Sequence, residues 1–140
     1  MFNYISKSAE DTLIFAKNYA KELKKNDVLI LTGDLGSGKT KFTEGILSFF
    51  GIENEISSPT FTIVNEYITT NINIYHFDVY RLKNSEDFFN IGGDEYFEKG
   101  ICIIEWGEII EDALPPHYIK ISFERMLENE NYRKIIIEKF

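Results

Sequence analysis

Residues 33–40 constrain the fold of this chain more than any other stretch, because they require a strand before them and a helix after them. They read Gly33-Asp34-Leu35-Gly36-Ser37-Gly38-Lys39-Thr40 and fit G-x-x-x-x-G-K-[ST], the pattern of phosphate-binding loops. The glycines let backbone N–H groups turn inward around phosphate oxygens. In such loops the lysine contacts the β- and γ-phosphates and the last hydroxyl binds Mg²⁺. The whole motif is therefore a candidate nucleotide site.

The flanking sequence has the order that such a loop needs. Residues 27–32 are a short apolar run typical of a buried strand. After the loop, apolar residues recur at the spacing of one helix face, and Gly51 follows where a C-cap glycine belongs. That face consists of Phe42, Ile46, Phe49 and Phe50. An ordinary glycine-rich turn is the alternative, but the helix dipole and this context favour an anion.

Composition limits the remaining classes of function. The chain has 140 residues, 44% of them hydrophobic, which is typical of one globular domain over 1–140. Its net charge of −8 opposes unaided binding to nucleic acid phosphates. We therefore expect no direct DNA binding, and contact with RNA only through a partner.

Cysteine usage and hydropathy indicate a cytoplasmic protein. Cys102 is the single cysteine and lies in an apolar run, so we expect it to be buried and unreactive. The N-terminus lacks the apolar stretch of a signal peptide, and no run approaches the length of a membrane span. We therefore expect no membrane association.

The remaining chain alternates predicted strands and helices. Ser8 and Asp11 resemble a capping box that begins a helix reaching to about residue 24. Apolar runs and alternation predict strands at 61–67, 71–77, 100–104, 119–124 and 132–139, and short helices from residue 85 and over 94–99. We predict an α/β, P-loop NTPase-like fold of three layers. Its mixed, largely parallel central sheet is flanked by helices and ends in a C-terminal antiparallel hairpin.

Two carboxylates follow predicted strands and are candidates for catalysis. Asp78 follows the strand at 71–77, and Glu105 follows the more apolar strand at 100–104. Ligands of α/β sheets bind at the carboxyl ends of the strands, and a phosphate-binding loop needs such a group for Mg²⁺. The pattern favours Glu105 as the metal ligand and Asp78 as the group that orients or deprotonates water, without settling the choice. For either, a surface carboxylate at a strand end is the alternative.

Three further side chains have competing interpretations. Thr60 lies where P-loop enzymes carry a loop that senses the γ-phosphate, and a plain turn is equally compatible. Trp106 could cover a base or a partner surface, although a core aromatic is the commoner fate. His76 is more consistent with a hydrogen-bonded structural residue than with a general base.

The motifs argue against two known classes of nucleotide-binding protein, GTPases and small-molecule kinases. A GTPase would carry N/T-K-x-D and D-x-x-G, but Val79, Tyr80 and Arg81 follow Asp78. A kinase usually needs an arginine-bearing lid, and the chain has only Arg81, Arg125 and Arg133. A module that binds ATP without hydrolysing it remains possible, and the balance favours a small ATPase.

Four motifs together resemble the TsaE (YjeE) family over nearly the whole chain. They are the phosphate-binding loop, Ser57-Ser58-Pro59-Thr60-Phe61 leading to Asn65-Glu66-Tyr67, His76-Phe77-Asp78-Val79-Tyr80-Arg81-Leu82, and Ile104-Glu105-Trp106-Gly107-Glu108. The resemblance implies a bacterial ATPase that works with the TsaD–TsaB heterodimer. That pathway installs threonylcarbamoyl on the adenosine beside the anticodon of tRNAs reading ANN codons, and ATP hydrolysis is expected to reset the complex.

The resemblance also implies roles for single residues. Lys39 and the loop amides would hold the phosphates of ATP, and Thr40 and Glu105 would hold Mg²⁺. Asp78 would be the catalytic carboxylate, Thr60 would belong to a switch-like loop, and Trp106 would lie at the nucleotide. The start of the first helix, residues 8–12, would approach the adenine, and Arg133 is the candidate basic residue near the last strands.

Overall fold

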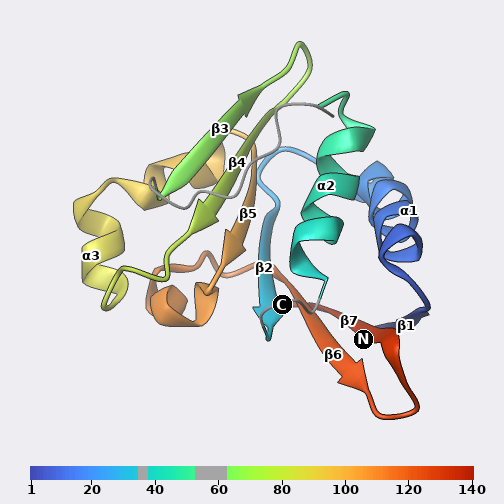
Figure 1. Cartoon of the computed structure of the whole chain (residues 1–140). Helices are drawn as coiled ribbons and strands as arrows, with labels where there is room; N and C mark the ends of the chain where they lie inside the picture. The colour runs from blue at the N-terminus through green and yellow to red at the C-terminus, as the bar shows by residue number, and fades with distance from the viewer. Residues whose placement is uncertain (35–37, 53–62) are drawn as a thin grey trace.

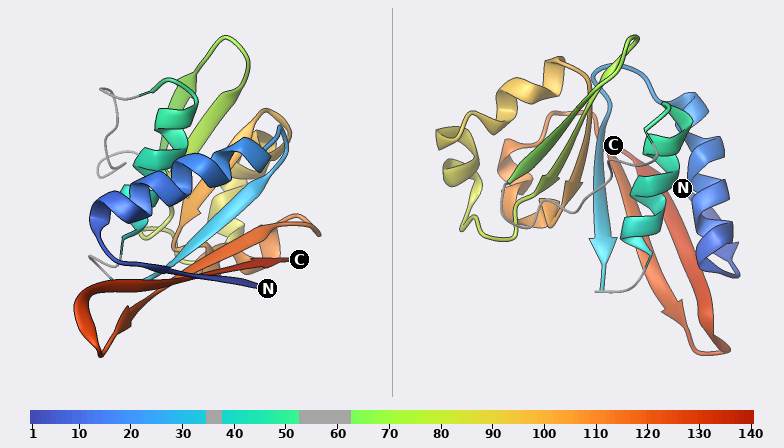
Figure 2. Two further views of the ribbon diagram at one scale, coloured as in Figure 1. Left: turned by 90° about the vertical axis from the view of Figure 1, so that its right-hand side faces the viewer. Right: turned by 45° about the horizontal axis from the view of Figure 1, so that its top comes forward.

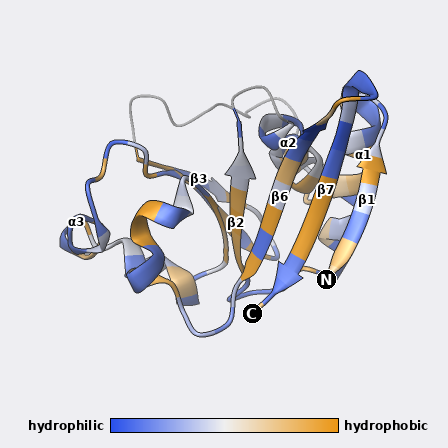
Figure 3. Cartoon of the chain, turned by 90° about the horizontal axis from the view of Figure 1, so that it is seen from below, coloured by the Kyte–Doolittle hydropathy of each residue, from blue (hydrophilic) through white to orange (hydrophobic). Residues whose placement is uncertain are grey.

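A single sheet organises the part of the chain that the computed structural model describes, residues 1–34, 38–52 and 63–140. Its strands lie in the order β1-β7-β6-β2-β5-β4-β3. Their bounds are β1 Phe2–Ser6, β2 Val28–Gly33, β3 Val64–Ile68, β4 Asn73–Asp78, β5 Ile101–Glu105, β6 Ile119–Met126 and β7 Asn129–Lys139. Figure 3 shows β1, β7, β6 and β2 side by side, with hydrophobic segments along them.

The centre of the sheet is parallel and its margins are antiparallel. β2 pairs in parallel with both β5 and β6, and β4 pairs in parallel with β5. The apolar segments 28–31 of β2 and 101–104 of β5 are buried throughout, as expected for strands covered on both faces. β3 joins β4, and β7 joins both β6 and β1, as antiparallel neighbours. The predicted mixed sheet and C-terminal hairpin are confirmed.

Helices cover both faces of the sheet and produce the predicted three layers (Figures 1 and 2). One face carries α1 (Ala9–Tyr19), the short 3₁₀ helix η1 (Ala20–Glu22) and α2 (Lys39–Phe49). The other carries α3 (Ser85–Asn90) and the 3₁₀ helices η2 (Gly93–Glu98) and η3 (Gly107–Ala113). Successive strand residues point to opposite faces, so each layer of helices has its own hydrophobic core. None of the described helices is long and apolar enough to cross a membrane.

Local signals account for the start of α1 and for the contact between α1 and α2. The Ser8 hydroxyl accepts a hydrogen bond from the Asp11 N–H at 2.9 Å, which satisfies one of the free donors of the first turn. Gly45 faces α1 in the middle of α2. A Cβ there would lie 2.4 Å from the Leu13 carbonyl oxygen, so the missing side chain lets the two helices meet closely.

Several element predictions differ from the structure. The first helix ends as an α-helix at Tyr19 instead of near residue 24. Phe49 is 38% exposed, and Leu47 is buried in its place. β1 and η3 were not predicted. β1 is an edge strand whose partner lies at the other end of the chain, so local periodicity carries little trace of it. The start of the strand predicted at 61–67 lies outside the described residues.

Candidate active site

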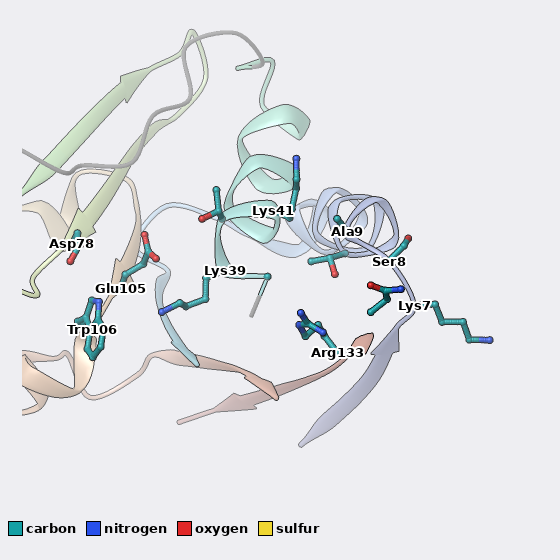
Figure 4. Close-up of a pocket in the computed structure, with 13 residues that line it drawn as sticks. Lys7, Ser8, Ala9, Lys39, Lys41, Asp78, Glu105, Trp106 and Arg133 are labelled. Carbon is teal, nitrogen blue, oxygen red and sulfur yellow. The ribbon is translucent and has the colours of Figure 1, made fainter. Parts of the chain in front are cut away.

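A pocket of about 540 Å³ lies where the carboxyl ends of β4 and β5 face the first turn of α2. Its size is in the range of small-molecule sites. The described residues that line it are Lys7, Ser8, Ala9, Thr12, Gly38, Lys39, Thr40, Lys41, Asp78, Glu105, Trp106, Asn131 and Arg133. Figure 4 shows Lys39 between two groups of these residues, with Glu105, Asp78 and Trp106 on one side and Arg133, Ser8 and Lys7 on the other. Elements from every part of the chain therefore meet at one site.

The described part of the phosphate-binding motif surrounds the start of α2. Gly38 is the N-cap of α2 with a φ of +112°, a conformation that favours glycine. Lys39 and Thr40 follow in the first turn and line the pocket. Gly33 ends β2 with a φ of +145°, and Asp34 is exposed beside it. The predicted contributions of Leu35, Gly36 and Ser37 lie outside the described residues.

Lys39 is buried but keeps its amino group in the pocket. The residue is 8% exposed, and its Nζ lies 5.3 Å from the centroid of the Trp106 ring. A cation over an indole face is attracted to the ring. This contact holds the ammonium group in the pocket close to the strand ends. The neighbouring Lys41 instead pairs with Glu44 at 3.0 Å on the exposed side of α2.

The two predicted carboxylates stand side by side. Asp78 and Glu105 are register partners at the ends of the parallel strands β4 and β5, so these strands bring both carboxylates to one edge of the sheet. The Asp78 Oδ1 accepts a hydrogen bond from the Tyr80 N–H at 3.0 Å. The Glu105 Oε2 lies 2.8 Å from the Nε2 of His76, a buried residue two positions before Asp78. His76 is thus hydrogen-bonded, as predicted.

The interpretation of Trp106 as a core aromatic is wrong. Its backbone has a φ of +65°, and the residue is 41% exposed at the rim of the pocket. Its ring lies 5.3 Å from that of Tyr80, which is also exposed. The left-handed conformation directly after β5 turns the side chain out of the sheet and toward Lys39. Sequence patterns do not reveal such a turn, because the position follows an apolar run.

The opposite wall of the pocket is built from both ends of the chain. Ser8, Ala9 and Thr12 come from the start of α1, as the family resemblance implied, and Arg133 comes from β7 opposite Ser6 of β1. The Arg133 Nη1 donates a hydrogen bond to the Tyr132 carbonyl at 2.8 Å, which directs the guanidinium along the hairpin. Sequence reasoning missed Lys7 and Asn131, which only the pairing of β1 with β7 brings to the pocket.

The oxygen donors in the pocket fit a hard divalent cation bound together with phosphates. Thr40 offers a hydroxyl, and Asp78 and Glu105 offer carboxylates. Among the described residues no group of three or more His, Cys, Asp or Glu could hold a metal ion. This donor set suits Mg²⁺, which keeps several waters and takes one or two carboxylates plus substrate phosphates.

Two further candidates stand apart from this arrangement. Thr60 lies outside the described residues, so its predicted role stays a prediction. Arg81 is exposed and does not belong to the described lining of the pocket, where Arg133 is the only arginine.

Comparisons with known proteins agree on one family. Residues 6–135 match the family model described as "Threonylcarbamoyl adenosine biosynthesis protein TsaE". A tRNA threonylcarbamoyladenosine biosynthesis protein TsaE of Rickettsia typhi is 40% identical over 95% of this chain and 93% of its own length. The protein of the same name from Bacillus subtilis is 43% identical over 86% of this chain and 76% of its own. The crystal structure of Bacillus subtilis YdiB superposes with a TM-score of 0.79 and 36% identity, covering 99% of this chain and 84% of that chain.

Proposed function

The chain belongs to the TsaE family of threonylcarbamoyl adenosine biosynthesis proteins, and we propose that it is a small P-loop ATPase that binds and hydrolyses ATP with Mg²⁺. One observation carries the proposal. The lysine and hydroxyl of the phosphate-binding motif share a pocket with two register-paired carboxylates at the ends of central parallel strands. A site that only gripped phosphate would not need carboxylates beside it, because they repel the anion unless a cation or a water lies between.

Each residue has a distinct task in this proposal. The N-terminus of α2 and the Lys39 ammonium hold the phosphates and offset their charge. Asp78 orients the attacking water and takes its proton as the water oxygen bonds to the γ-phosphorus. The bond from phosphorus to the β–γ bridging oxygen breaks, which releases ADP and phosphate. Thr40 and Glu105 would hold Mg²⁺, which supplies charge stabilisation at the phosphate oxygens.

The other parts of the pocket would hold the rest of the nucleotide. Arg133 and the start of α1 lie across Lys39 from the carboxylates (Figure 4). In the proposal this wall receives the adenosine, while Trp106 covers the phosphate end of the site. Thr60 is proposed to join the site through the switch-like loop.

We further propose that this ATPase serves the TsaD–TsaB complex, which modifies the adenosine next to the anticodon of tRNAs reading ANN codons. The net charge of −8 supports a protein that reaches tRNA only through such partners. A single arginine among the described pocket residues supports slow turnover alone and stimulation by a partner. Because tRNA and ATP meet there, the proposed location is the cytoplasm.

Nucleotide binding and turnover of three proteins test the ATPase proposal. Wild type should bind ATP with Mg²⁺ and release phosphate, and Lys39→Ala should lose most of its ATP affinity. Asp78→Ala should keep ATP affinity but lose turnover, because its carboxylate acts on water and not on the nucleotide. Undiminished ATP affinity of Lys39→Ala would contradict the proposal. Phosphate release that persists in Asp78→Ala would remove that residue from its role.

Phosphate release with and without the partners tests the second part. The rate should rise when TsaD and TsaB are added together, and bovine serum albumin at equal mass serves as a control for crowding. Equal rates would contradict a partner-stimulated ATPase. Partner binding without phosphate release in any mixture would instead indicate a nucleotide-gated binding module.

A further inference from the structure

His76 is a buried polar side chain that lies in the sheet between Ile103 of β5 and Asn65 of β3. It is 4% exposed in the middle of β4. Ile74 precedes it by two positions and Ile103 is its register partner on β5; both are fully buried in the core that α1 and α2 cover. An aliphatic residue would suit such a position, because an imidazole loses hydrogen bonds to water on burial. The histidine therefore calls for a reason other than packing.

The ring makes one hydrogen bond within the described residues, and that bond reaches the proposed metal ligand. Its Nε2 lies 2.8 Å from the Glu105 Oε2. Its Nδ1 is buried and has no hydrogen-bond partner in the described part of the chain. A ring with one satisfied nitrogen gives the fold little, since an unpaired buried nitrogen costs free energy. The one interaction that the buried imidazole adds to the described structure is its hydrogen bond to Glu105.

We propose that His76 is a positioning residue for Glu105. The Nε2–H group donates to Oε2 and fixes the carboxylate at the end of β5, so that Oε1 is held ready for a divalent cation. Carboxylates and imidazoles that bind metals are commonly oriented by a second hydrogen bond of this kind. The inference rests on the proposed function, because it assumes that Glu105 contacts Mg²⁺.

The geometry argues against a direct part in catalysis. His76 does not belong to the described residues that line the pocket, whereas Asp78 and Glu105 do. Its ring is covered by the core, and its bonded nitrogen already faces Glu105. The effect of His76 on the nucleotide therefore passes through the carboxylate.

Two substitutions separate the hydrogen bond from the packing. In His76→Gln the amide N–H takes about the place of Nε2 and can still donate to Glu105. In His76→Leu a side chain of similar bulk fills the core without a donor. The measurement is the affinity for adenosine 5′-O-(3-thiotriphosphate) by calorimetry, once with Mg²⁺ and once with EDTA. The dissociation constant in EDTA divided by that with Mg²⁺ reports how much the metal contributes to binding.

We expect His76→Leu to lower this ratio about tenfold, in the range for lost partners of metal ligands. The affinity in EDTA should stay the same, and His76→Gln should restore most of the ratio. A general defect of the fold would instead weaken binding equally in both conditions. In a Glu105→Gln background, replacing His76 should change nothing further.

An unchanged ratio in His76→Leu would overturn the inference, as would equal losses in the Gln and Leu variants. If wild type itself shows no difference between Mg²⁺ and EDTA, the proposed metal role of the site fails instead. Should His76→Leu not fold, His76→Asn replaces it. Its amide falls about one bond short of Glu105, so a ratio equal to that of His76→Gln would equally overturn the inference.

Discussion

The two faces of the central sheet have different kinds of core. The face under α1 and α2 contains all five buried polar or charged side chains of the described chain: Ser6, Thr12, Lys39, Thr43 and His76. The face under α3, η2 and η3 is filled by aromatic and aliphatic groups, and the Phe88 ring contacts those of both Phe77 and Phe97. One sheet thus separates a polar face that builds the site from an apolar face that braces it.

This difference has a physical cause. Buried polar groups need partners in fixed positions, so they restrict the elements that supply them. The Ser6 and Thr12 hydroxyls lie 2.6 Å apart, and the Thr43 hydroxyl donates to the Lys39 carbonyl at 3.1 Å. Both contacts lie beside the pocket, at the starts of α1 and α2. On the apolar face the packing of rings and aliphatic side chains sets fewer such directional demands, so this face can supply stability without entering the site.

The largest effect is expected on the apolar face. Phe88→Ala should lower the free energy of unfolding by about 3–5 kcal/mol, because it empties a fully buried site. Urea denaturation measures this loss. The affinity for ATP with Mg²⁺ should stay within about twofold of wild type. Phe89→Ala, at an exposed neighbour, is the control and should cost less than about 1 kcal/mol. If folded Phe88→Ala also lost ATP affinity, the apolar face would not be independent of the site.

The next effect is expected at the start of α2. Thr40→Val removes a hydroxyl in the pocket while keeping the shape of the side chain. Mg²⁺-dependent phosphate release should fall about 100-fold, the loss typical of one preorganised polar group. Thr43→Val is the matched control, since that hydroxyl donates to the Lys39 carbonyl in the backbone of α2. Its activity should remain within a few-fold of wild type. Equal losses in both variants would indicate damage to the helix and not to the site.

A smaller effect with a broader reach is expected from Gly45→Ala. The added Cβ would meet the Leu13 carbonyl oxygen at 2.4 Å and the Ala16 Cβ at 2.6 Å. Parting α1 from α2 should cost about 1–2 kcal/mol, after the better helix propensity of alanine is counted. Both helices begin at the pocket, so ATP affinity should also fall, unlike in Phe88→Ala. Lys17→Ala, at an exposed residue of α1, is the control. A stable Gly45→Ala protein with lower ATP affinity would locate the effect in the site alone.

The smallest effect is expected at Cys102. The Cys102 side chain is fully buried in the core of the apolar face. This burial raises the pKa of its thiol to about 12. The reactive thiolate is therefore scarce near pH 8, and Ellman's reagent should label the native protein far more slowly than the protein in urea. Rapid labelling of the native protein would show that the apolar face opens in solution.

The parts of the fold that sequence reasoning found are those encoded by neighbouring residues. The strand, loop and helix around Gly38 follow each other directly, so composition and period suffice to predict them. Asp78 and Glu105 each end a buried strand, and parallel pairing brings strand ends to one edge. These rules placed both carboxylates in the same pocket as Lys39.

The parts that were missed depend on contacts between distant residues. Lys7 and Asn131 reach the pocket only because β1 pairs with β7. β1 itself has one exposed edge and a weak pattern, so its existence is decided by a partner far along the chain. The Trp106 side chain points away from the core because of one backbone angle, its positive φ. Local periodicity in the sequence predicts neither how distant strands pair nor the backbone conformation of a single residue.

The pairing of β1 with β7 has a consequence for how the protein matures. Ser6 lies opposite Arg133, so the wall formed by the start of α1 and by Arg133 closes only after β7 has been synthesised. A chain still emerging from the ribosome can assemble β2, α2, β4 and β5 first, with the phosphate-binding motif and both carboxylates already near each other. The pocket stays open on one side until β7 is in place. Synthesis of β7 is therefore a condition for a closed pocket.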